Sequence, residues 1–189
     1  MNMIGEYKGK VKNKVITALL TAYHEILDYD GLKSILNEAN MLHLKNIKDI
    51  NTEESMDFFS FKKIVSAQNV LLFESNLLLR LIGEKFSFYL FPFGKDFEEI
   101  IKEINELINT DWKVTITNKT PEEIKISVQK CVFCSEIGVS CDLFKGFLIH
   151  SLEKTLQSGM KIAIVEEKEN ILDPNHSSFK LILKIQKNG

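Results

Sequence analysis

At residues 112–128 the chain reads WKVTITNKTPEEIKISV. Apolar residues alternate with polar ones on both sides of the turn sequence Asn118-Lys119-Thr120-Pro121. An alternation of period two predicts a strand with one buried face, and two such runs joined by a short turn predict a β-hairpin. The sequence before the hairpin has the period of a helix. The hairpin therefore decides the fold class, because it adds a sheet to a chain that begins with helices.

Apolar residues upstream of Thr110 recur every three to four positions, which predicts amphipathic helices. Asp30-Gly31 and Pro92-Phe93-Gly94 are expected to interrupt the helical part. The longest predicted helix is apolar on more than one face, so we expect it at the centre of the molecule or at an interface. The helices are predicted at about 10–28, 32–39, 59–83 and 96–108.

A helix and two further strands are predicted after the hairpin. The helix covers about 142–157, and the strands cover 160–166 and 179–185. The C-terminal half therefore has the order β-β-α-β-β. The predicted fold class is α+β, with N-terminal helices packed on a four-stranded antiparallel sheet. We expect a helical part at 1–110 and a sheet-bearing part at 111–189, together in one compact unit.

Composition excludes several classes of protein. The chain has 189 residues, is 44% apolar and carries a formal net charge of −2. Its 24 basic residues are balanced by 26 acidic ones, so there is no electrostatic case for nucleic acid, and the single arginine, Arg80, leaves little for bidentate phosphate contacts. Charged residues interrupt the most apolar stretch, Val70–Phe93, so no membrane span is expected. Three cysteines are too few for a secreted disulfide framework, and we expect a cytoplasmic protein.

The three cysteines form the clearest chemical pattern. Cys131 and Cys134 make a C-x-x-C pair, and Cys141 follows at a predicted helix start. Two residues between sulfurs allow both to point at one centre, which suits zinc or thiol chemistry. A structural zinc site needs a fourth ligand, for which His150 and His176 are the nearest candidates. The alternative is that the cysteines fill the core where the strand ends and the helix starts.

An aromatic segment and a helical glycine also stand out. Residues 86–93 read FSFYLFPF, which suits an ordinary core, an apolar pocket or a dimer contact. Gly146 lies inside the predicted helix beside Phe144 and Phe147. Glycine weakens a helix, so we expect another backbone or a ligand to approach closely there. A tolerated surface glycine is the alternative.

The C-terminal half resembles a 4-vinyl reductase-type domain, also described as a hydrocarbon-binding domain. The resemblance covers roughly 111–186, and the family pattern is a strand ending in C-x-x-C, a cysteine opening a glycine-containing helix, and a strand ending in glutamate. It implies a dimeric α+β fold shared with subunits of TRAPP-type vesicle-tethering complexes, with a channel for an apolar molecule. The matching text is Val128–Cys134, Ser140-Cys141, Gly146-Phe147-Leu148, Gly159–Glu167, Asp173-Pro174 and Phe179–Leu183.

The resemblance also implies a metal site, because some sensor relatives hold zinc. Carried over by position, two of their ligands are Cys141 and Glu166. Their two later cysteines are missing here, and Glu169 and Ser177 occupy those places with His176 adjacent. The zinc ligands expected here are therefore Cys141, Glu166, Glu169 and His176. No other cofactor is expected, and no residue is assigned as a reductase catalyst.

Together these patterns predict non-catalytic binding of a hydrophobic small molecule or acyl chain by a sensor or carrier. A homodimer is expected through the Phe59–Gly83 helix. One alternative is an interaction or tethering scaffold without ligand, and another is a zinc- or thiol-dependent enzyme using the cysteines and His150. The residues predicted to line or close the channel are Phe88, Tyr89, Phe91, Phe144, Phe147 and Leu148.

Overall fold

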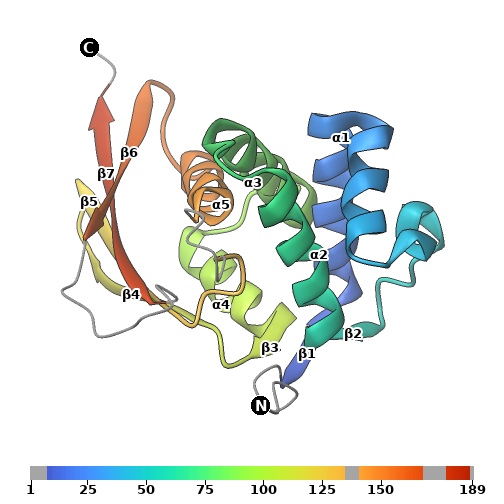
Figure 1. The fold of residues 1–189 in the computed structure, drawn as a ribbon. Coiled ribbons are helices and arrows are strands. Elements are labelled where there is room, and N and C mark those ends of the chain that lie inside the picture. The colour runs from blue at the N-terminus through green and yellow to red at the C-terminus, as the bar shows by residue number, and fades with distance from the viewer. Residues whose placement is uncertain (1–7, 135–140, 168–177, 188–189) are drawn as a thin grey trace.

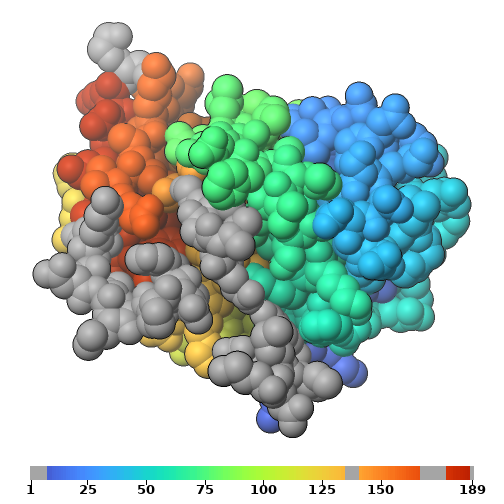
Figure 2. Space-filling view, viewed as in Figure 1, coloured from blue at the N-terminus to red at the C-terminus, as the bar shows by residue number. Residues whose placement is uncertain are grey.

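A computed structural model describes residues 8–134, 141–167 and 178–187. Figure 1 shows a four-stranded sheet on one side, the helix α5 (Asp142–Glu153) next to it, and most of the remaining helices beyond α5. The space-filling view in Figure 2 shows the strands and the helical part as opposite sides of one continuous body. The α+β fold class is confirmed.

The four-stranded sheet contains both arms of the predicted hairpin. The strands are β4 (Lys113–Lys119), β5 (Glu123–Gln129), β6 (Met160–Glu167) and β7 (Phe179–Lys187). Their order is β4-β5-β7-β6, and every neighbouring pair is antiparallel. The predicted alternation holds, because Ile126 and Val128 of β5 are fully buried between half-exposed neighbours.

The helical part contains α1 (Asn13–Glu38), α2 (Phe58–Leu71), α3 (Asn76–Leu90) and α4 (Phe97–Leu107), with short 3-10 turns at 42–45 and 47–49. The predicted break near Gly31 is a kink inside α1, at Asp28 with φ 60°. The Asp28 carboxylate stabilises the kink by accepting hydrogen bonds from the backbone N–H groups of Asp30 and Gly31. No helix in the described part of the chain combines the length and apolarity needed to cross a membrane.

The prediction of one helix over Phe59–Gly83 is wrong. The chain leaves the helical conformation after Leu71, passes Glu74 with φ 64°, and resumes as α3 at Asn76. Two shorter helices can each turn an apolar face to the core, which one straight helix cannot. Leu77, at the start of α3, stays 71% exposed. The predicted homodimer stays a prediction.

The sequence analysis did not predict a second, three-stranded sheet. It has the order β2-β1-β3, formed by Ser55–Asp57, Gly9–Lys12 and Ile108–Thr110. Both pairings are antiparallel. The strands lead into α1 and α2 and out of α4, so this small sheet ties together one end of all three helices.

Two glycines let α3 and α5 cross with their backbones in contact. A Cβ atom on Gly83 would lie 1.8 Å from the carbonyl oxygen of Leu143, and one on Gly146 would lie 2.1 Å from that of Arg80. The hydroxyl oxygens of Ser87 and Ser151 are 2.8 Å apart across the same crossing. The close approach predicted at Gly146 is confirmed, and its partner is a helix backbone.

Substitution at this crossing should be costly. Gly83→Ala and Gly146→Ala should each lower the free energy of unfolding by about 3 kcal/mol, because a methyl group forces two helix backbones apart. Gly94→Ala is the matched control, since a Cβ at Gly94 meets nothing within 4 Å. Urea denaturation followed by circular dichroism measures all three, and equal stability of the three variants would contradict the close crossing.

Candidate functional site

An aromatic cluster fills the interior where the sheet, α5, α3 and α2 meet. Its central rings are stacked, with Phe133 and Phe144 5.8 Å apart at 12° and Phe144 and Phe147 5.7 Å apart at 13°. Every member is 3% exposed or less. The seven members come from separate parts of the chain and are Phe61, Phe86, Phe91, Trp112, Phe133, Phe144 and Phe147.

Trp112 is the only ring of the cluster that carries a hydrogen-bond donor. It stands edge-on to Phe133 at 5.6 Å and to Phe144 at 5.3 Å. Its indole nitrogen, Nε1, is buried and has no hydrogen-bond partner among the described residues. A buried donor without a partner lowers the free energy of unfolding by about 1–3 kcal/mol. A hydrogen-bond acceptor placed beside this N–H would recover that loss.

The residues predicted to line a channel divide into two groups. Phe91, Phe144, Phe147 and Leu148 are buried, and Phe91 lies 6.2 Å from Phe147. Phe88 is 44% exposed and packs against Tyr89, whose hydroxyl donates to Glu25. The structure thus buries four of the predicted residues, leaves Phe88 exposed and holds Tyr89 half-buried against the core.

The three cysteines meet beside the aromatic cluster. Cys131 and Cys134 follow β5, and Cys141 is the N-cap residue of α5. Their sulfur atoms all lie within 4.8 Å of one another, and those of Cys131 and Cys141 are 3.2 Å apart. All three are buried free thiols. The predicted convergence of the C-x-x-C pair on one centre is therefore confirmed, and it includes the third cysteine.

Hydrogen bonds organise the C-x-x-C segment. Burial opposes ionisation of Cys131, but the thiols of Cys134 and Cys141 and the backbone N–H groups of Phe133 and Cys134 hold the pKa of Cys131 well below its usual value. Donation to Cys131 raises the pKa of Cys134, and burial does most to raise that of Cys141.

Lys62 of α2 clamps the same segment. Its Nζ donates to the carbonyl oxygens of Cys134 at 2.9 Å and Val132 at 3.2 Å. The charge of the same ammonium group lowers the pKa of Cys134, although the hydrogen bond to Cys131 and burial outweigh it. The cysteine segment is therefore attached both to the sheet, which it follows, and to the helical layer.

The other predicted metal ligands do not join this cluster in the described part of the chain. Glu166 of β6 is ion-paired with Lys145 at 2.9 Å, its side chain is 45% exposed, and it lies outside the group of three sulfurs. His150 packs beside Phe88, and burial and two nearby lysines lower its pKa. Glu169 and His176 lie outside the described residues, so their predicted role stays a prediction.

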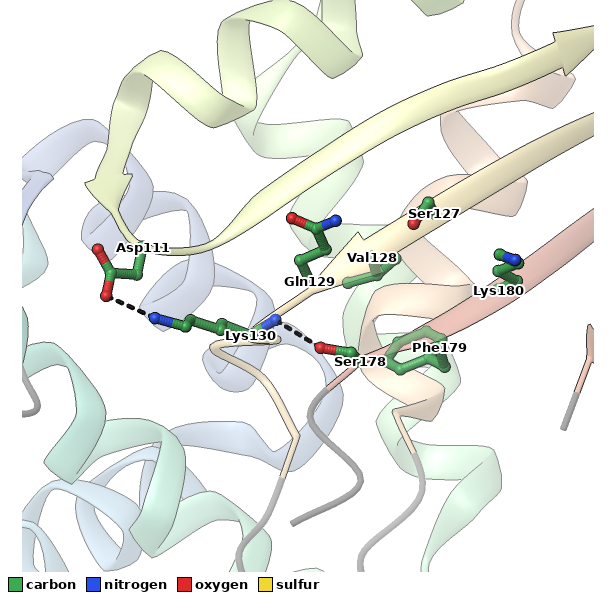
Figure 3. A pocket seen from close by; sticks show the side chains of 8 residues that line it. All are labelled: Asp111, Ser127, Val128, Gln129, Lys130, Ser178, Phe179 and Lys180. Atoms are coloured by element: carbon green, nitrogen blue, oxygen red, sulfur yellow. Dashed lines mark hydrogen bonds and ion pairs between the residues drawn. The ribbon is translucent and has the colours of Figure 1, made fainter. Parts of the chain in front are cut away.

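An open groove of about 560 Å³ lies where β5 ends and β7 begins (Figure 3). Lys130 spans it, with its Nζ 2.8 Å from the carboxylate of Asp111 and its backbone N–H donating to the Ser178 hydroxyl. The groove is mostly polar and contains no member of the aromatic cluster or the cysteine cluster. It therefore offers no place for a buried apolar ligand.

No protein-family model and no curated protein matches the sequence. Solved structures match it along nearly its whole length. An Fe(II) unliganded H-NOX protein mutant from K. algicida has a TM-score of 0.61 at 13% identity, covering 94% of this chain and 98% of that one. An oxygen-binding H-NOX domain related to soluble guanylate cyclases gives 0.62 at 14%, covering 95% and 97%. A third structure, from work on heme distortion in the H-NOX family, gives 0.59 at 14%, covering 95% and 96%.

The chain therefore has the fold of H-NOX domains. The resemblance to 4-vinyl reductase-type domains and TRAPP-type tethering subunits is wrong, because the full-length structural matches are H-NOX domains. The resemblance followed the order β-β-α-β-β and a few cysteine and glycine positions. That order is compatible with more than one fold, and the packing of the N-terminal helices distinguishes them.

The Lys62 clamp can be tested through thiol reactivity. Lys62→Met removes two charged hydrogen bonds from the cysteine segment and should speed native-state labelling of the three thiols by about tenfold or more. Lys63→Met is the matched control, because Lys63 lies over the Phe59 ring instead. Labelling with a chromogenic disulfide reagent measures the rates, and equal rates in the two variants would refute the clamp.

Proposed function

We propose that this chain is a non-catalytic sensor domain that binds a small apolar molecule within the aromatic cluster. Two findings support the proposal. The fold is that of H-NOX domains, one of which binds oxygen, and ligand sites favour the junction of structural layers. The buried, unpartnered indole N–H of Trp112 lies at this junction and carries the proposal.

Heme is the first ligand to consider, because matched H-NOX structures concern heme distortion and heme redox potential. Heme iron needs an axial ligand, most often histidine or a cysteine thiolate. His24 and His43 are exposed, whereas His150 is half-buried beside Phe88, and its Nε2 is buried without a hydrogen-bond partner among the described residues. The three cysteines gather within 4.8 Å of one another, a spacing for one small ion.

The interior also lacks a slot for heme in the described part of the chain. The rings of Phe133, Phe144 and Phe147 stack on one another and Trp112 stands edge-on to them, so they fill the interior around α5. A porphyrin is far wider than a phenyl ring and would have to displace several of these side chains together. The residues present do not fit heme, and the ligand proposed here is a smaller molecule.

The cluster defines the chemistry of that ligand. Its walls are aromatic, so the ligand is apolar over most of its surface and replaces contacts between rings. The Trp112 N–H can only donate, so the ligand carries one acceptor, such as a carbonyl or ether oxygen. Burying about 200 Å² of apolar surface contributes about 5 kcal/mol, which supports weak to moderate binding after association costs.

Titration with hemin tests the exclusion of heme. The purified apo-protein should give no saturable shift of the Soret band, because aromatic rings fill the interior and leave no slot for a porphyrin. A Cys131→Ser variant run in parallel separates nonspecific thiol ligation from a built site. A Soret shift that saturates at one hemin per chain in both proteins would show that heme does fit.

Trp112→Phe tests the ligand proposal. The variant keeps an aromatic ring but loses the N–H, so it should bind small aryl ketones about tenfold more weakly than the native chain, the loss expected for one hydrogen bond. Thermal shift and calorimetric titration with acetophenone and ethylbenzene measure the effect. The native chain should prefer the ketone, and the variant should lose that preference.

The control for this experiment is Phe88→Leu, which changes an aromatic residue at the surface and should leave binding unchanged. Organic extraction of the native protein followed by mass spectrometry searches for a ligand carried from the cell. No thermal shift with either probe, together with an empty extract, would remove the ligand proposal and leave the aromatic cluster as an ordinary core.

A further inference from the structure

We propose that this chain forms a homodimer by pairing β6 with β6 of a second copy. β6 is an edge strand: it pairs with β7 on one side, and no described strand pairs with its other side. The interface differs from the homodimer contact expected at Phe59–Gly83. It is also independent of the apolar ligand, because it rests on the edge of the sheet and not on the aromatic cluster.

The β6 edge lacks the features that prevent a strand from pairing with another chain. Proteins usually protect a sheet edge with proline, a bulge, a central charge or a covering side chain, because its unpaired N–H and C=O groups otherwise bind a further strand. β6 reads MKIAIVEE over eight residues, and it pairs with β7 along its whole length without a bulge. Its four central residues, 162–165, are all apolar, and Val165 is 42% exposed.

The opposite edge of the same sheet, β4, has two of these protective features. A bulge interrupts its pairing with β5 between Ile116 and Asn118. The Asn105 side chain of α4 accepts a hydrogen bond from the Val114 N–H and donates one to the Val114 carbonyl oxygen, both at 2.8 Å. Because β4 is bulged and covered in this way, β6 is the edge of this sheet that can accept another strand.

A second copy of β6 is a suitable partner, because the strand is complementary to itself. A two-fold axis perpendicular to the sheet pairs β6 antiparallel with its copy and keeps the faces of the two sheets continuous. With the axis at Ile164, Ala163 of one copy lies opposite Val165 of the other. Both residues lie on the face turned away from the core, because Ile164 between them pairs with the fully buried Leu183. The centre of the interface is therefore apolar on both copies.

Charge complementarity favours this register. With the axis at Ile164, Lys161 of each copy lies opposite position 167 of the other copy, which is a glutamate. The dimer then has an oppositely charged pair at each end of its apolar centre, and such directly opposite pairs stabilise antiparallel strands. An axis at Ala163 would instead place Lys161 opposite Val165, and both charged pairs would be lost.

Sedimentation velocity of the native chain over a range of concentrations tests the proposal. We expect a reversible dimer with a dissociation constant in the micromolar range, because strand pairing alone buries a narrow interface. Val165→Lys places a charge at the centre of the edge and should raise the dissociation constant at least tenfold. Val165 is exposed in the single chain, so the variant should still fold, which circular dichroism verifies.

Charge reversal tests the register. Lys161→Glu places like charges opposite each other at both ends of the interface and should raise the dissociation constant about tenfold. The double variant Lys161→Glu/Glu167→Lys exchanges the two charges and should return the constant to within about threefold of the native value. The matched control is Lys113→Glu, the same substitution on the protected strand β4, which should leave the constant unchanged.

Three results would overturn the proposal. The first is a native chain that stays monomeric at every concentration tested. The second is a dimer that Lys161→Glu and Lys113→Glu weaken equally, or that the double variant fails to restore. The third involves Leu77→Lys, at the exposed start of α3. A dimer that is lost in Leu77→Lys and kept in Val165→Lys would assign the contact to α3 and not to β6.

Discussion

The contact between the backbones of α3 and α5 is the constraint on which the rest of the structure depends. Gly83 and Gly146 each face a carbonyl oxygen of the opposite helix. A side chain at either position would collide with that oxygen and keep the two helices apart. That approach places Phe86 5.2 Å from Phe147 and brings together the hydroxyls of Ser87 and Ser151. Because α5 also lies against the sheet, the crossing sets the distance between the sheet and the helical layer. The aromatic cluster fills the volume that this distance leaves.

Much of this architecture could be predicted from local patterns. The change from a helical period to a period of two near Thr110 indicated the two halves, and the two alternating runs do pair as a hairpin, with Ile116 opposite Ile126. The interruption between α2 and α3 could not be predicted, because Glu74 takes a left-handed conformation that glycine or asparagine usually signals. The three-stranded sheet was missed because its strands have only three or four residues, too few to show an alternation.

In the candidate sites too, only features that depend on neighbouring residues of the chain could be predicted from the sequence. The spacing of Cys131 and Cys134 is a local signal, and it correctly indicated that their sulfurs converge. The surroundings of Glu166 depend on a contact from another element: Lys145 reaches it from α5, and no spacing along the chain indicates that pair. The unpartnered indole of Trp112 is equally invisible in the sequence, because an unmet hydrogen bond depends on every group that packs around it. Convergence within a few residues can be read from a sequence, whereas the absence of a partner cannot.

Phe133 connects the aromatic cluster to the C-x-x-C segment. The ring of Phe133 stacks on Phe144 and stands edge-on to Trp112, while its backbone N–H contributes to lowering the pKa of Cys131. A ligand accepted by Trp112 must displace ring contacts, and those contacts include Phe133. In this chain, aromatic rings occupy the interior of an H-NOX fold, and the cysteine segment that carries Phe133 connects the sheet to α2 through Lys62.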